Sequence, residues 1–182
     1  DAIGNLIVIK KGQGGPQSKR IMFAAHMDEI GFMVKKIEED GRLRVCNVGW
    51  NWAASAYNAR VRFRNGVTGV FGCMGAIEDA HNDVGKLYID IGCASKEEAM
   101  ALADPGDEVC FPAGFGSFGN GCLKGKAIDD RFGCAVMVEL IRSELPWDCW
   151  FSFSVQEEVG CRGAAGSSFS IAPDYAIALE AT

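Results

Sequence analysis

Short apolar runs that end in acidic residues are the clearest pattern along this chain. Runs of this length are typical of strands that are buried on both faces of a parallel sheet. The strands predicted from the pattern cover residues 6–10, 21–25, 149–156 and 175–179. Helices are predicted over residues 130–143 and 163–169, each ending before a proline. Strands that alternate with helices predict an α/β fold with a doubly wound, mixed sheet.

The middle of the chain has a different pattern, with short alternating segments and hairpin signals. Asp40-Gly41 and Asn65-Gly66 are dipeptides typical of tight hairpin turns, and strands are predicted on both sides of each. A capping box from Ser95 to Glu98 begins a short helix. These features predict a small antiparallel unit, rich in strands and barrel-like.

The two patterns predict two structural parts. The β-rich unit is expected to cover residues 33–120, and it interrupts an α/β domain made of residues 1–32 and 121–182. The chain begins at Asp1 rather than at a methionine, and it stops directly after a predicted core strand. We therefore expect it to be a fragment of a larger protein.

Composition and charge exclude some functions. Of the 182 residues 48% are hydrophobic and 23% are charged, and the formal net charge is -6. This charge argues against a nucleic-acid surface, because phosphate binding needs clustered lysines and arginines. Arg60, Arg62 and Arg64 alternate along a predicted strand and are expected to form a solvated face. No apolar stretch approaches the roughly 18–20 residues of a membrane helix, so no membrane association is predicted.

The eight cysteines are scattered along the chain. None belongs to a C-x-x-C pair and none is next to a histidine. Several occupy positions where a small hydrophobic residue suits a strand or helix, as free cysteine does in a reducing compartment. They are predicted to be structural thiols of a cytoplasmic protein.

The first acidic motif is His26-Met27-Asp28, behind the strand over 21–25. Residues two apart on an extended segment face the same way. The Asp28 carboxylate could therefore accept a hydrogen bond from the far ring nitrogen of His26, which would fix its tautomer and raise its basicity as a metal ligand. A histidine that is simply hydrogen-bonded at a strand end is the alternative for this motif alone.

The other acidic motifs are Asp129-Asp130, Glu157-Glu158 and Glu180. By itself Asp129-Asp130 also suits the N-terminus of a helix. Two adjacent carboxylates at a buried sheet edge cost several kcal/mol unless they are paired or bound to metal. Ligands of such sheets bind outside the carboxyl ends of the strands, so all the motifs are expected to meet there. A pair of divalent metal ions is the natural counter-charge.

Such a pair would determine the chemistry. Two metal ions about 3.5–4 Å apart need a bridging carboxylate, and a water between them becomes a nucleophile near neutral pH. Neighbouring glutamates cannot both point at the metals from an extended backbone. One is expected to ligate, while the other acts as general base toward the water and then protonates the leaving nitrogen. This chemistry predicts hydrolysis of an amide or peptide bond.

Three stretches of the chain closely resemble the signatures of the glutamyl aminopeptidase family (metallopeptidase family 42). These are cytoplasmic dinuclear metallopeptidases that include the tetrahedral aminopeptidases. The stretches are residues 25–34 (AHMDEIGFMV), 127–136 (AIDDRFGCAV) and 154–164 (SVQEEVGCRGA). Residues 1–6, 87–92 and 95–99 are also similar to family segments, so the resemblance spans nearly the whole chain.

The resemblance implies a zinc-peptidase-like fold and an aminopeptidase that acts on short peptides. It implies that His26 binds one metal ion, that Asp129 bridges both ions and that Glu158 binds the second. It also implies that Glu157 is the general base and that Asp28 supports His26. The β-rich insertion would be a dimerisation domain, in a family that commonly assembles into homo-oligomeric dodecamers.

The chain departs from the family pattern at its end. The family typically carries Asp-Val-Thr where this chain has Glu180-Ala181-Thr182. Glu180 keeps an oxygen donor, so it is expected to remain a metal ligand. The family's last ligand is a histidine further downstream, so we expect the second metal site to be incomplete in this chain. His81 is expected to be a loop residue and not this ligand.

Several points stay open at this stage. Zinc and cobalt are the expected ions, although oxygen and nitrogen ligands also accept manganese. An N-acyl amidohydrolase or deacylase uses the same chemistry. A catalytically inactive assembly protein is a further alternative, because of Glu180 and the missing histidine.

Overall fold

The computed structural model describes residues 1–14, 19–80 and 82–181. The chain forms two compact units, one made of Asp1–Glu29 with Ala127–Thr182 and the other of Ile30–Lys126. His81 lies outside the described residues, so its assignment to a loop stays a prediction. The division lies close to the expected domain boundaries, after residues 32 and 120, without coinciding with them.

Four strands form the sheet of the α/β unit. They are β1 (Leu6–Lys10), β2 (Ile21–His26), β11 (Cys149–Ser154) and β12 (Tyr175–Ala178). They lie in the order β1-β11-β2-β12, in which β2 is parallel to both of its neighbours and β1 is antiparallel to β11. The predicted mixed sheet is confirmed, and its three parallel strands end at the same edge.

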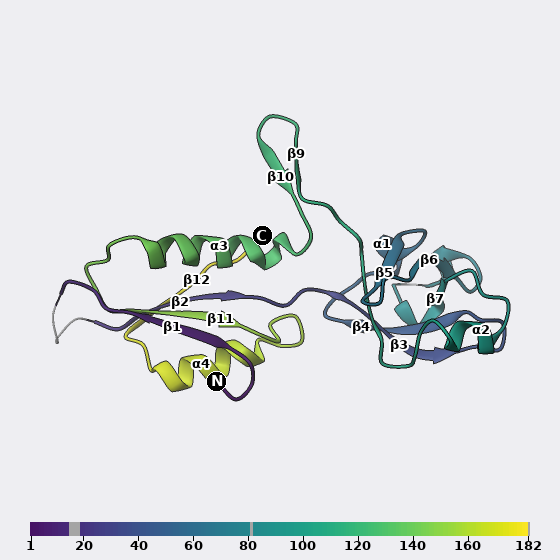
Figure 1. The fold of residues 1–182 in the computed structure, drawn as a ribbon, viewed down its shortest axis with the longest axis horizontal. Coiled ribbons are helices and arrows are strands. Elements are labelled where there is room, and N and C mark those ends of the chain that lie inside the picture. The colour runs from purple at the N-terminus through teal and green to yellow at the C-terminus, as the bar shows by residue number, and fades with distance from the viewer. Residues whose placement is uncertain (15–18, 81, 182) are drawn as a thin grey trace. The chain divides into compact units, whose positions relative to one another are not determined.

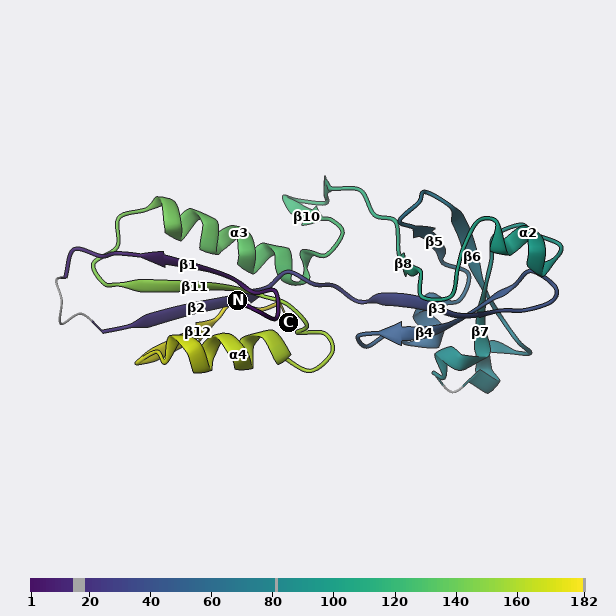
Figure 2. The ribbon, with the colours of Figure 1, turned by 60° about the horizontal axis from the view of Figure 1, so that its bottom comes forward.

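Two helices cover opposite faces of this sheet, α3 (Ile128–Arg142) and α4 (Arg162–Ile171) (Figures 1 and 2). Met137 of α3 packs with Phe151 and Phe153 of β11 in the core of the unit. Phe23 of β2 stacks on Phe151, with ring centroids 5.3 Å apart. The prediction of burial is confirmed for β11 and in part for β2. It is wrong for β12, an edge strand that is exposed along its whole length.

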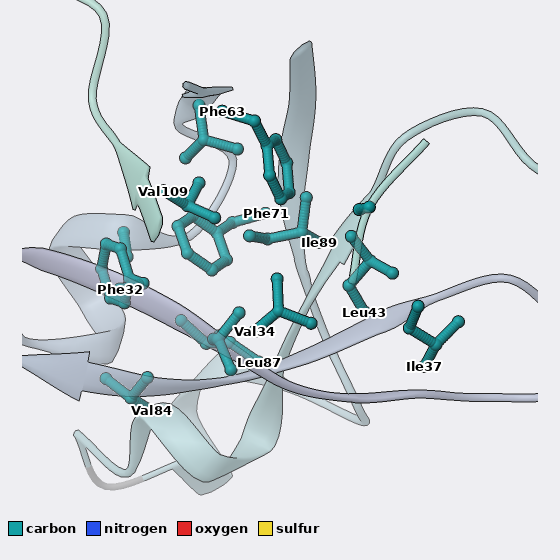
Figure 3. Packing of buried hydrophobic residues seen from close by; sticks show 14 of the residues in the cluster. Phe32, Val34, Ile37, Leu43, Phe63, Phe71, Val84, Leu87, Ile89 and Val109 are labelled. Carbon is teal, nitrogen blue, oxygen red and sulfur yellow. The ribbon is translucent and has the colours of Figure 1, made fainter. Parts of the chain in front are cut away.

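The second unit is a closed barrel with the strand order β3-β4-β7-β6-β5-β8. The strands are β3 (Gly31–Ile37), β4 (Leu43–Val48), β5 (Arg60–Phe63), β6 (Thr68–Cys73), β7 (Leu87–Asp90) and β8 (Glu108–Cys110). Phe32, Phe71, Leu87 and Ile89 are among the side chains that fill its interior (Figure 3). The barrel-like insertion predicted from the sequence is confirmed.

Both predicted hairpins of the barrel are present. Gly41 lies between β3 and β4 with φ +81°, and Gly66 lies between β5 and β6 with φ +92°. These left-handed conformations explain why glycine follows Asp40 and Asn65 at the turns.

Several short elements of this unit were not predicted. They are α1 (Ala53–Ala56), the two 3-10 turns η1 (Ile77–Ala80) and η2 (Val84–Lys86), and the hairpin strands β9 (Gly116–Phe118) and β10 (Cys122–Lys124). The predicted short helix is α2 (Lys96–Met100), and the Ser95 hydroxyl accepts a hydrogen bond from the Glu98 amide at its start.

Across the described chain, we find no helix with the length and apolar content needed to span a bilayer.

Candidate metal centre

The carboxyl ends of three parallel strands bring the predicted acidic residues together. His26 is the last residue of β2 and is 1% exposed. Glu157 and Glu158 follow β11, and Glu180 follows β12. Asp129 reaches the same place from the N-terminal end of α3, a position that Asp129-Asp130 also suited by sequence.

The imidazole of His26 lies at the centre of this group. Its Nε2 is 3.0 Å from Oδ1 of Asp129, 3.6 Å from Oε1 of Glu180 and 3.8 Å from Oε2 of Glu157. One ligand atom each from His26, Asp129 and Glu158 lie within 4.8 Å of one another. The same holds for His26, Asp130 and Glu180. The structure therefore brings together all of the residues predicted at the site.

Asp28 acts differently from the sequence-based expectation. Nδ1 of His26 is 3.1 Å from the backbone oxygen of Asp28, and it is 3.5 Å from the carboxylate. The backbone carbonyl, which lies nearer, therefore fixes the ring tautomer. The Asp28 carboxylate accepts hydrogen bonds from the backbone amides of Glu157 at 3.1 Å and Glu158 at 3.2 Å. It thereby fixes the backbone that carries both glutamates.

Asp130 is a site residue whose role the sequence did not reveal. Its side chain is fully buried and accepts hydrogen bonds from the amides of His26 at 3.1 Å and Gly133 at 3.0 Å. Asp129 and Asp130 have non-helical backbone angles within α3, so the bond to Gly133, three residues on, has the pattern of an N-cap for the helix that follows. A Cβ atom on residue 133 would lie only 2.5 Å from the carboxylate, so this position requires glycine. The Asp-x-x-Gly spacing was the available signal.

The electrostatics of the group favour a bound cation. Burial works to lower the pKa of His26, but the carboxylates of Glu180, Asp129, Asp28 and Glu157 outweigh it and raise this pKa above its usual value. Burial, and then the charge of Asp129, raise the pKa of Glu158. These directions mean that the crowded carboxylates gain from any positive charge placed among them.

The donor set fits a divalent ion. It consists of one imidazole nitrogen and several carboxylate oxygens, which is the ligand chemistry that zinc, cobalt and manganese share. Neither group of three has a cysteine sulfur among its ligand atoms. Cys161 lies nearby, where its thiol donates a hydrogen bond to Oε1 of Glu157 at 3.1 Å.

Comparison with known proteins gives a consistent result. The family model described as M42 glutamyl aminopeptidase matches residues 4–182. The chain is 45% identical over 190 residues to a putative aminopeptidase of Acetivibrio thermocellus, a match that covers all of this chain and 54% of that protein.

Solved structures agree with the sequence comparison. An aminopeptidase of the archaeon Desulfurococcus kamchatkensis superposes with a TM-score of 0.88 at 36% identity, over 100% of this chain and 52% of that one. The TET1 peptidase of Pyrococcus horikoshii has a TM-score of 0.82 at 36% identity, over 99% of this chain and 57% of that one. The chain thus spans about half the length of the relatives that it matches.

Proposed function

Because this chain belongs to the M42 glutamyl aminopeptidase family, we propose that its protein is a metal-dependent aminopeptidase that removes N-terminal residues from short peptides. One observation carries the proposal: Nε2 of a buried imidazole lies within 4 Å of three carboxylates at the carboxyl edge of the sheet. Carboxylates crowded around one imidazole repel one another and are stabilised by a bound cation, and the group has the ligand types of a hydrolytic metal site.

We assign the metal ligands from this geometry and from the family pattern. His26 and Asp129 would hold one ion, with Asp129 shared between two ions, while Glu158 and Glu180 supply further oxygen ligands. Zinc or cobalt is proposed. When bound, the ions supply Lewis acidity that polarises a peptide carbonyl and lowers the pKa of a nearby water.

Glu157 is assigned as the general base. Its Oε2 is 3.8 Å from the histidine at the centre of the group, and its backbone amide is bound by Asp28. The Glu157 carboxylate takes a proton from the attacking water and returns it to the leaving nitrogen of the peptide. The Asp28 carboxylate fixes the backbone of Glu157 and Glu158. The backbone carbonyl of Asp28 fixes the ring of His26.

The barrel unit is proposed to mediate self-association. The Pyrococcus horikoshii TET1 peptidase is described as assembling into a tetrahedron or a large octahedral shell. By similarity we propose a homo-oligomer in which residues of the barrel unit form dimer contacts. A cytoplasmic location is proposed because the eight cysteines are free thiols.

The test uses the full-length protein and short peptides with a free or an acetylated N-terminus. We expect release of N-terminal residues from the free peptides and loss of activity after chelation. Glu157→Gln should lower kcat by about 10²- to 10⁴-fold, because general base catalysis contributes this much. Glu139→Gln is the control, since Glu139 is an exposed residue of α3 that pairs with Arg142.

The results separate the alternatives. Cleavage of only the acetylated compounds would indicate a deacylase. Absence of both stoichiometric metal and turnover would indicate an inactive assembly protein. Full activity of Glu157→Gln would remove the general base from the proposal.

A further inference from the structure

Asn5 has a buried side-chain amide whose polar atoms are all used. It lies directly before β1 and is 4% exposed. Its Oδ1 accepts a hydrogen bond from the Val155 amide at 3.0 Å. Its Nδ2 donates to the carbonyl of Gly163 at 2.8 Å and to the Asp1 carboxylate at 2.7 Å. A polar side chain buried with every hydrogen bond made holds its partners in one arrangement.

The two backbone partners of Asn5 lie at the ends of one loop. Val155 follows β11, Gly163 belongs to the first turn of α4, and the loop between them carries Glu157 and Glu158. The Gly163 amide also donates directly to the Val155 carbonyl at 3.0 Å. Asn5 therefore adds two hydrogen bonds across the base of this loop.

The base of the loop is too tight for any side chain on residue 163. A Cβ atom there would lie 2.2 Å from the Val155 carbonyl oxygen and 2.4 Å from Oδ1 of Asn5. Glycine at this position lets the loop close onto Asn5. At the far end, the Asp28 carboxylate binds the amides of Glu157 and Glu158. The loop is thus fixed at its base by Asn5 and at its tip by Asp28.

We propose that Asn5 is a positioning residue, which fixes the loop so that Glu157 and Glu158 keep their places beside His26. The proposal rests on the proposed function, because it assigns the base and a metal ligand to this loop. Removing the amide deprives the partly buried Val155 N–H of its acceptor and the buried Gly163 carbonyl of this donor. The loss of these partners favours an opened loop that water can reach.

The decisive variant is Asn5→Ala, with Ser167→Ala as the matched control. The Ser167 hydroxyl is fully buried and hydrogen-bonds Ser152 at 2.8 Å, so it joins the same strand and helix at a point away from the loop. Asn5→Ala removes hydrogen bonds that join the segment after β11 to α4, and Ser167→Ala removes one that joins β11 itself to α4. Only Asn5→Ala is expected to speed hydrogen exchange of the amides in residues 155–163.

The second measurement is the binding of cobalt(II) to the full-length protein. Asn5→Ala should weaken cobalt binding by about 10-fold or more, as loss of a residue that orients metal ligands does. It should also lower kcat while leaving KM nearly unchanged. Ser167→Ala should leave the cobalt affinity and kcat at their wild-type values.

A second variant keeps the test decisive if Asn5→Ala fails to fold. Asn5→Asp has the same shape and keeps the acceptor for Val155, but it cannot donate to Gly163. It should likewise weaken cobalt binding. The positioning role would be overturned if an Asn5 variant kept wild-type hydrogen exchange in residues 155–163 and wild-type cobalt affinity. It would also be overturned if Ser167→Ala lost as much cobalt affinity as the Asn5 variants. A wild-type protein that binds no cobalt would instead overturn the proposed function, and the positioning role with it.

Discussion

The two units of the molecule bury different kinds of side chain. The barrel interior is apolar, and among the described residues Asn51, between β4 and α1, is the one buried polar residue of the barrel unit. The buried polar side chains of the α/β unit are Asn5, His26, Asp130, Ser152, Ser154 and Ser167. Each of these needs a specific partner, because an unpaired buried polar group costs free energy.

This difference suggests that side chains of the barrel unit mainly determine stability, while the buried polar side chains of the α/β unit mainly determine metal binding. The barrel is held by the burial of apolar surface, which tolerates variation in detail as long as volume is kept. In the α/β unit several buried hydrogen bonds hold the backbone around the site, for example those that the Asp130 carboxylate accepts from the amides of His26 and Gly133. We therefore expect barrel substitutions to change the free energy of unfolding, and polar substitutions in the α/β unit to change metal binding.

The largest effect should be a loss of unfolding free energy caused by Phe71→Ala, which truncates a side chain of the barrel core. Phe71 is 1% exposed and packs edge-on against Phe32, with ring centroids 4.6 Å apart. Removal of a buried phenylalanine side chain costs about 3–5 kcal/mol. Urea denaturation should show this loss, while the cobalt affinity of the remaining folded protein stays unchanged.

Val70→Ala is the control on the same strand, because Val70 is 43% exposed. It should change the free energy of unfolding far less. A fall in cobalt affinity with Phe71→Ala would contradict the separation between the two units.

The next largest effect should come from Asp130→Asn, and it should be on metal binding and not on the free energy of unfolding. One oxygen of Asp130 becomes an amide NH₂ group, so either the His26 or the Gly133 amide loses its acceptor. Displacement of His26 should weaken cobalt binding by about 10- to 100-fold, as measured by titration calorimetry.

Asp174→Asn is the matched control for Asp130→Asn. The Asp174 carboxylate also accepts a hydrogen bond from a backbone amide, that of Arg20 at 2.8 Å, but on an exposed part of the same unit. It should leave the cobalt affinity unchanged. Equal affinities for wild type and Asp130→Asn would mean that the buried carboxylate does not orient His26.

Local sequence signals predicted most of the fold. The apolar runs predicted β2 and β11, and the Asp40-Gly41 and Asn65-Gly66 turns predicted two hairpins, because period and turn chemistry act over a few residues. The hairpin of β9 and β10 was missed although Asn120-Gly121 lies in its turn. Its strands have three residues each, which is too short to show a period.

The sequence predicted that His26, Asp129, Glu158 and Glu180 lie close together, but it predicted their hydrogen bonds only in part. The parallel strands explain why His26 and Glu158 meet, since their ends share one edge of the sheet. The Asp28 carboxylate binds backbone amides 129 and 130 residues further along the chain. No local pattern encodes such a contact, because it depends on how the loop after β11 folds back onto the end of β2.

The smallest effect should come from a helix cap in the barrel unit, Ser95→Ala. The Ser95 hydroxyl accepts a hydrogen bond from the Glu98 amide at 3.3 Å, and the Glu98 carboxylate binds the Ala94 amide at 2.9 Å. Loss of an N-cap costs about 0.5–2 kcal/mol, and the low end is expected here because the Glu98 contact remains. Urea denaturation should detect this cost, whereas Ser95→Thr, which keeps a hydroxyl, should show almost no loss of unfolding free energy.

Neither variant should alter cobalt affinity, because α2 belongs to the unit whose interior is apolar. A change in affinity with Ser95→Ala but not with Ser95→Thr would show that even a cap in the barrel influences the metal ligands.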